Sequence, residues 1–131
     1  MNVDIVCYKD GCHGDNSGMI LLNDQKPEGV CVHPEIERLS RVTRESMFIA
    51  IDQCKPGVPF SKIGETIQDY ANAHNFFVNE EFGGHGIAHH LHMPPLVHHL
   101  RTPTARKEEM RPGMAFTIEP ILMMHSSVDY K

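Results

Sequence analysis

The sequence lacks any long apolar run, because its uninterrupted hydrophobic stretches are only a few residues long. A helix needs ~20 such residues to cross a bilayer. It also lacks a basic block: 12 lysines and arginines stand against 17 aspartates and glutamates, for a net charge of −5. That balance argues against binding of nucleic acids or anionic membranes. The first residues show neither the basic nor the apolar segment of a secretory signal, so we expect a cytoplasmic protein.

CxxC pairs, internal repeats and low-complexity tracts are absent as well. Without CxxC spacing, the four cysteines favour reduced thiols in a cytosolic protein. With 131 residues, 40 % hydrophobic and 22 % charged, the composition is typical of one globular domain. Histidine is the residue type in excess, with ten copies, and its side chains are therefore the first candidates for a functional role.

The N-terminal part of the chain predicts a β-hairpin. Residues 2–8 and 16–22 contain many β-forming side chains and flank a segment dense in turn residues. Residues 23–32 follow as a predicted loop, because proline and glycine interrupt them.

The rest of the chain predicts two helices followed by strands. Apolar residues recur at three- and four-residue steps over 34–54 and again over 61–75, where Ser61 is the expected N-cap. Short strands are expected at 76–78 and 114–123. The order of hairpin, helices and further strands predicts an α+β fold.

Two aspartates of the predicted hairpin are candidate ligands. Asp4 stands among apolar residues, where a carboxylate is costly to bury unless a cation or hydrogen-bond donors compensate. Asp15 follows on the other side of the turn, so both carboxylates can share one face of the hairpin. The alternative is that Asp15 only serves the turn, as aspartate often does in a Gly-Asp-Asn-Ser run.

The second half of the chain adds a histidine cluster and a glutamate. His85 lies between glycines, which let the backbone approach a ligand closely. Three more histidines follow up to His92, and such density is typical of a metal-binding tract. Glu119 is a carboxylate within an apolar strand candidate, and its alternative interpretation is an outward-facing strand position.

Two aspartates, one glutamate and one histidine form an oxygen-rich set of candidate ligands. Such a set suits Mn, Co, Fe or Zn bridged by carboxylates rather than a structural Cys/His zinc site. Two such ions close together activate a water and polarise a carbonyl, which is hydrolytic chemistry.

Four segments, in order, resemble the signatures of type I methionine aminopeptidases. They are NVD at 2–4, GCHGDNS at 11–17, GHGIAHHLH at 84–92 and MRPGMAFTIEP at 110–120. Proline-specific aminopeptidases and creatinase share the metal pattern, but Gly-His-Gly-Ile and Phe-Thr-Ile-Glu-Pro favour the methionine enzymes. The resemblance implies a partial pita-bread fold, in which two helices cover an antiparallel curved sheet.

The resemblance also implies a role for each candidate residue. Two divalent metal ions are expected, with four ligands in this chain: Asp4, Asp15, His85 and Glu119. Two catalytic roles are implied, with Glu119 shuttling a proton and His92 holding the scissile peptide and its oxyanion. The implied reaction removes the N-terminal methionine from peptides or nascent proteins whose second residue is small. The ribosome is a further expected partner.

The chain departs from the family pattern at both ends. The 12 residues after Glu119 contain no glutamate, whereas the family has one more bridging glutamate on a later strand. In the family, half of the sheet also precedes the position of Asp4. We therefore expect residues 1–131 to be a single catalytic-type domain fragment without that half and the final strands, which binds metal weakly. Ala88 and Leu91 replace residues that are usually glycine and phenylalanine.

Two other hypotheses remain open. An inactive descendant of the fold could serve as a binding module, or a histidine-rich protein could buffer metal ions. The joint presence of the five site residues favours the enzyme. We expect His98, His99 and His125 to be surface or partner-contacting groups rather than metal ligands, and we expect no ligand role for His89 and His90.

Overall fold

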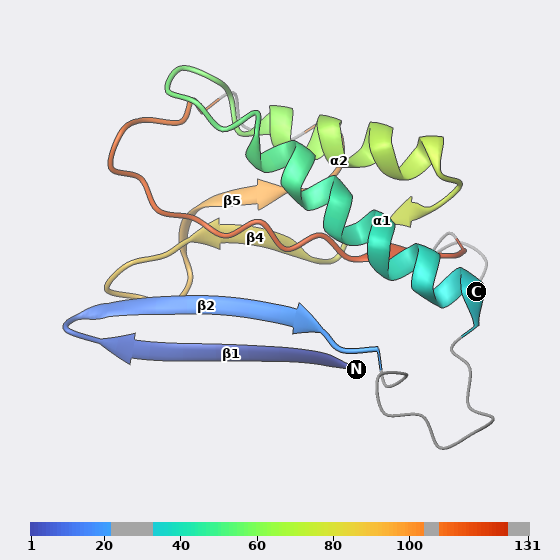
Figure 1. The fold of residues 1–131 in the computed structure, drawn as a ribbon. Coiled ribbons are helices and arrows are strands. Elements are labelled where there is room, and N and C mark those ends of the chain that lie inside the picture. The colour runs from blue at the N-terminus through green and yellow to red at the C-terminus, as the bar shows by residue number, and fades with distance from the viewer. Residues whose placement is uncertain (22–32, 104–107, 126–131) are drawn as a thin grey trace.

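The computed structural model describes residues 1–21, 33–103 and 108–125 (Figure 1). In these ranges the elements are β1 (Asn2–Lys9), β2 (Cys12–Met19), α1 (Pro34–Ile51), α2 (Ser61–Ala73), β3 (Phe77–Val78), β4 (Gly83–Gly86), β5 (Met93–His98) and β6 (Leu122–Met123). The strands pair antiparallel as β1–β2, β3–β6 and β4–β5. The α+β class is confirmed, although the described strands form three two-stranded ladders rather than one continuous sheet.

The β1–β2 hairpin turns at Asp10 and Gly11, whose φ angles are 53° and 86°. An Asp-Gly pair adopts this two-residue turn readily, since it tolerates positive φ at both positions. The turn is tighter than predicted, because β2 begins at Cys12 rather than at residue 16. Pairing with β1 overrides the turn preference of the small polar residues in β2. The loop predicted at 23–32 lies outside the described residues.

Both helices form where they are predicted and end slightly earlier. Helix α1 ends at Ile51 rather than at 54, and α2 at Ala73 rather than at 75. Ser61 is the first helical residue of α2, and the N-cap is Phe60, which makes no side-chain capping bond. In the part of the chain that the structure describes, no helix is long and apolar enough to cross a membrane.

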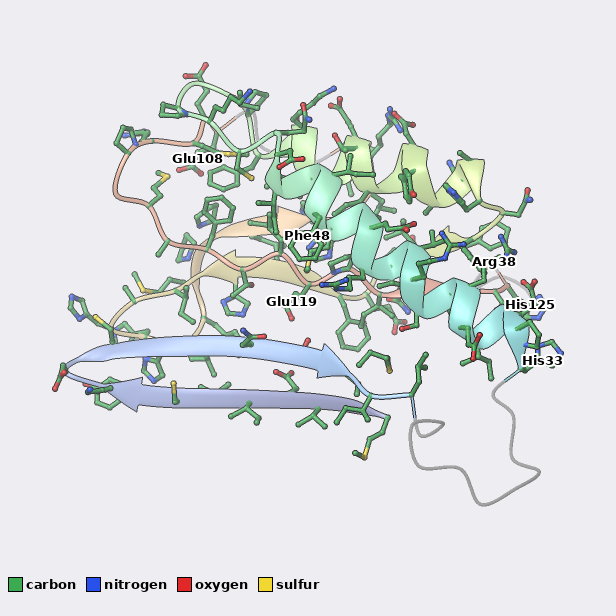
Figure 2. All side chains as sticks on the ribbon, in the orientation of Figure 1. His33, Arg38, Phe48, Glu108, Glu119 and His125 are labelled. Atoms are coloured by element: carbon green, nitrogen blue, oxygen red, sulfur yellow. The ribbon has the colours of Figure 1, made fainter. Side chains whose placement is uncertain are left out.

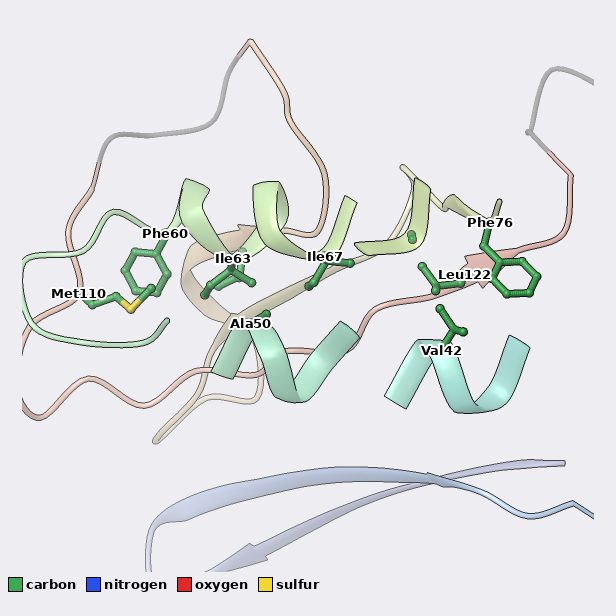
Figure 3. Close-up of a cluster of buried hydrophobic side chains, with 10 residues drawn as sticks. Val42, Ala50, Phe60, Ile63, Ile67, Phe76, Met110 and Leu122 are labelled. Carbon is green, nitrogen blue, oxygen red and sulfur yellow. The ribbon is translucent and has the colours of Figure 1, made fainter. Parts of the chain in front are cut away.

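The hydrophobic core lies between the two helices and the strands behind them (Figure 3). Its buried members come from both helices, the flanks of α2, strands β5 and β6, and the segment before β6: Val42, Ala50, Phe60, Ile63, Ile67, Ala71, Phe76, Val97, Met110 and Leu122. The apolar residues that recur at helical spacing in α1 do not all face the core, because Ile36 and Ile51 are 45 % and 41 % exposed. The side of α1 that faces the core carries Val42, Ser46 and Ala50.

The strand predicted at 114–123 is regular only at its end, as β6. The segment before β6 is nevertheless attached to β4. Phe116 forms an isolated bridge with Gly86, and the N–H of Thr117 donates to the carbonyl oxygen of His85 at 2.8 Å. This attachment brings the C-terminal part of the described chain next to the histidine cluster.

Strands β4 and β5 are absent from the sequence prediction. Their sequences, GGHG and MPPLVH, disfavour a strand because glycine has no side chain to pack and proline has no N–H to donate. Their pairing is interrupted by a register shift between His85 and Gly86. Figure 1 shows this pair between the helices and the β1–β2 hairpin.

Gly64 of α2 lies where the helix closely approaches the end of β5. A Cβ atom at this position would lie 2.6 Å from the carbonyl oxygen of His98 and 2.8 Å from the nitrogen of Leu100. We expect Gly64→Ala to lower the free energy of unfolding by about 1–3 kcal/mol in urea denaturation, because backbone atoms must shift. Gly18→Ala is the control, since a Cβ there meets nothing within 4 Å in the described structure. Equal losses in both variants would contradict this account.

Candidate metal centre

Three ligand-type side chains converge from three parts of the chain. His85 of β4 places its Nε2 3.5 Å from Oδ2 of Asp15, in β2, and 3.4 Å from Oε1 of Glu119. One ligand atom from each residue lies within 4.8 Å of the others. The side chain of Glu119 is 40 % exposed, against 11 % for His85 and 15 % for Asp15. Figure 2 shows Glu119 projecting from its segment toward the hairpin. We call these three residues the acceptor trio.

Glycines on both sides of His85 let neighbouring segments pack against β4. A Cβ on Gly84 would collide with the carbonyl oxygen of Thr117, and one on Gly86 with that of Pro94. The absent side chains therefore admit the segment of Glu119 next to β4 and allow β5 to pair with it. His85 is thereby placed at the meeting point of three segments.

The ring of His85 is oriented for ligand binding. Its Nδ1 lies 3.1 Å from the carbonyl oxygen of Gly86, an arrangement in which Nδ1 carries the proton and donates it. In the neutral ring, Nε2 then presents a lone pair to the two carboxylates, and three electron-pair donors face one another. A cation between them relieves the repulsion, and one nitrogen with two carboxylate oxygens suits a divalent transition metal. The residues present therefore fit the metal that the sequence implies.

Thr117 links two members of the acceptor trio. Its hydroxyl oxygen accepts a hydrogen bond from the N–H of His85 at 3.0 Å and donates one to Oε1 of Glu119 at 2.6 Å. The sequence interpretation missed this residue. The available signal was its position two residues before Glu119, since alternate residues of an extended segment share a face.

Asp15 reaches the trio because the hairpin is fastened to the loop after β4. The backbone N–H and the ring Nδ1 of His13 lie 2.8 Å and 3.1 Å from the carbonyl oxygen of Ala88. In the opposite direction, Nδ1 of His89 lies 2.9 Å from the carbonyl oxygen of Gly11. His89 thus holds the hairpin in place, a role that the sequence interpretation missed.

The structure places Asp4 and His92 outside the acceptor trio. Asp4 is exposed on β1 opposite Ser17, and this register puts it on the same hairpin face as Asp15, as a diagonal neighbour. The exposed ring of His92 packs edge-to-face against His85, with 4.5 Å between the centroids and 77° between the planes. Both residues border the trio, and neither supplies an atom to it.

His99 is fully buried, which corrects the prediction that it lies on the surface. Its Nε2 accepts a hydrogen bond from the backbone N–H of Glu119 at 3.2 Å. Burial, with a smaller contribution from His98, lowers the pKa of His99 from 6.5 to about 4. The prediction failed because His99 directly follows β5, and the two prolines of β5 disfavour the prediction of this strand. His98 is half-buried and His125 is exposed.

Comparison with known proteins shows to which family the chain belongs. Residues 1–129 match the sequence profile of metallopeptidase family M24. The chain belongs to the M24 family. The methionine aminopeptidases of Buchnera aphidicola and Escherichia coli are 39 % identical over 124 residues and 38 % identical over 122 residues. Each alignment covers 93 % of this chain and 43 % of the relative.

A solved structure supports the same assignment. The methionine aminopeptidase of Rickettsia prowazekii superposes with a TM-score of 0.83 at 32 % identity, covering 95 % of this chain and 47 % of that one. The chain thus spans less than half the length of these relatives. The resemblance to methionine aminopeptidases and the α+β pita-bread fold are confirmed, while the roles of individual residues stay predictions.

We expect Thr117→Val to weaken divalent-cation binding by roughly 10–100-fold, because it removes the hydroxyl that links His85 and Glu119. Isothermal titration with Mn²⁺ measures this loss. Thr117→Ser keeps the hydroxyl and serves as the control. Equal affinities for the Val and Ser variants would contradict the proposed contribution of the hydroxyl.

The free energy of unfolding should decrease as the pH falls from 6.5 to 4. Across this interval the unfolded chain protonates His99 while the folded protein keeps it neutral, since burial lowers its pKa to about 4. The contribution amounts to up to about 3 kcal/mol, is fully present above pH 6.5 and disappears as the pH approaches 4. Urea denaturation across this range should show a shallower pH dependence of the free energy of unfolding in His99→Gln than in a control variant of the exposed His90, His90→Gln. Identical pH dependence in both variants would refute the prediction.

Proposed function

We propose that this chain carries the metal-binding part of an aminopeptidase that removes N-terminal methionine from nascent proteins. The observation that carries the proposal is the acceptor trio, which directs one nitrogen and two carboxylate oxygens toward a common point. The relatives named above are methionine aminopeptidases. Since the chain covers 43 % of the curated relatives, the activity of the complete enzyme is transferred to it as a proposal.

Two divalent ions of Mn, Co, Fe or Zn are the proposed cofactors. The trio of Asp15, His85 and Glu119 supplies ligands, and Asp4 adds a carboxylate from the same face of the hairpin. Bound ions of this kind supply Lewis acidity and an activated water for attack on a peptide carbonyl.

Two side chains of the site have proposed roles in moving protons and stabilising charge. Glu119 is partly exposed, and the Thr117 hydroxyl holds its Oε1. It can therefore accept a proton from water and pass it to the leaving amine. His92 is exposed beside His85, where its ring can donate to the scissile carbonyl and stabilise the developing oxyanion.

The proposed substrate is a peptide or nascent chain with an N-terminal methionine and a small second residue. The relatives' name specifies methionine, and the preference for a small second residue comes from the family resemblance. The ribosome as a partner and the cytoplasm as the compartment belong to the same proposal. Nucleic acid and membrane are not proposed as partners, in keeping with the net charge of −5.

Hydrolysis of a Met-Ala-Ser peptide in the presence of Mn²⁺ or Co²⁺ tests the proposed function. We expect methionine release to require the added metal. Glu119→Gln should lower the rate by a factor on the order of 10²–10⁴, because it removes the group that transfers the proton. Glu80→Gln, an exposed glutamate outside the trio, is the control and should keep the rate.

Three results would contradict parts of this proposal. Equal release by Glu119→Gln and the wild type would remove the role of Glu119, and release without metal would remove the proposed cofactors. Tight Mn²⁺ binding without any cleavage would favour the inactive binding module instead.

A further inference from the structure

We propose that His99 is a positioning residue for Glu119: its buried ring holds the Glu119 backbone so that the carboxylate faces Asp15 and His85. This inference rests on the metal centre proposed above and adds a residue that does not itself touch the metal. The sequence analysis assigned His99 to the surface, and the family resemblance gave it no role.

The first argument is that His99 has one identified polar contact on its ring. Nε2 accepts the hydrogen bond from the N–H of Glu119 at 3.2 Å, so the ring proton must sit on Nδ1. Among the described residues, Nδ1 is buried and has no hydrogen-bond partner. A buried, unpartnered N–H is unfavourable, and an apolar side chain of similar size would avoid it. The imidazole provides the hydrogen bond to the Glu119 N–H, which an apolar residue would not provide.

The second argument is that Glu119 needs a fixed partner for its backbone. The next residue is Pro120, which has no N–H, so the Glu119 N–H is the last donor before Ile121. The Thr117 hydroxyl binds the carboxylate, while His99 binds the main chain. The two contacts fix both ends of the Glu119 residue, which sets the direction of its side chain.

The third argument is that His99 is itself firmly mounted. The backbone on both sides of His99 packs so closely against α2 that only glycine fits at position 64. Two residues later, Arg101 makes a two-pronged ion pair with Asp69 of α2, with N–O distances of 2.6 and 2.7 Å. The backbone N–H of Arg101 also donates to the side chain of Gln68. Helix α2 therefore supports the ring that holds Glu119.

Three variants separate positioning from general packing. His99→Gln places an amide oxygen where it can accept the Glu119 N–H, whereas His99→Leu fills the space without an acceptor. His98→Leu is the neighbouring control, because its ring has no contact with Glu119 among the described hydrogen bonds. In calorimetric titrations with Mn²⁺, we expect His99→Leu to lose roughly 10-fold or more in affinity. His99→Gln and His98→Leu should stay within about 3-fold of the wild type. Equal affinity of His99→Leu and the wild type would overturn the proposal.

Two measurements on the metal-free protein test His99 independently of the metal centre. Crystal structures should show the Glu119 carboxylate displaced from Asp15 and His85 in His99→Leu and in place in His99→Gln. An unmoved carboxylate in His99→Leu overturns the inference. If the wild type binds no Mn²⁺, the metal centre fails, and this comparison still decides the role of His99.

The second measurement needs no variant and therefore applies even if His99→Leu does not fold. A through-hydrogen-bond coupling between the Glu119 amide nitrogen and Nε2 of His99 is expected in NMR spectra of the wild type. Its absence, or a proton on Nε2, would overturn the proposal.

Discussion

The attachment of the segment before β6 to β4 is the constraint on which the candidate centre depends. The N–H of Thr117 donates to the carbonyl of His85, and the N–H of His85 donates to the hydroxyl of Thr117. These reciprocal bonds join residues 32 positions apart in the sequence. They are possible because Gly84 has no side chain to hold the two backbones apart. Without them, the imidazole and the carboxylate would belong to unrelated parts of the molecule.

The acceptor trio also illustrates how a binding site can be assembled from atoms that repel one another. In the neutral state of His85, two carboxylate oxygens and an imidazole lone pair face each other. Each is held by groups outside the trio: Gly86 orients the ring, and Thr117 and the hairpin contacts position the carboxylates. The folding energy of the surrounding structure maintains an arrangement that a cation stabilises. Such organisation before binding is what distinguishes a ligand site from a chance group of acidic residues.

Local patterns were sufficient to predict some features and not others. Helices α1 and α2 follow from the spacing of their apolar residues, and the hairpin from its β-forming flanks. Glycine and proline prevented the prediction of β4 and β5 from local preference, although the glycines of β4 serve close backbone approach there rather than a turn. His99 could not be placed for the same reason: its burial depends on a strand that no local preference indicates. Motif order correctly indicated the M24 family, whereas the separation of Asp4 from the trio depends on tertiary geometry.

The way the hairpin is fastened has a thermodynamic consequence. Several of its apolar side chains are exposed, Ile5 and Tyr8 by more than 60 %. The described polar contacts of the hairpin to the loop after β4 lie near its turn. Asp15 therefore lies next to His85 only while the hairpin is packed against the loop after β4. A cation bound by both residues would draw its affinity partly from that docking and would reinforce it in return. Cation binding and packing of the hairpin against the loop after β4 are therefore thermodynamically coupled. Amide hydrogen exchange in β2 is expected to be slower when the cation is bound.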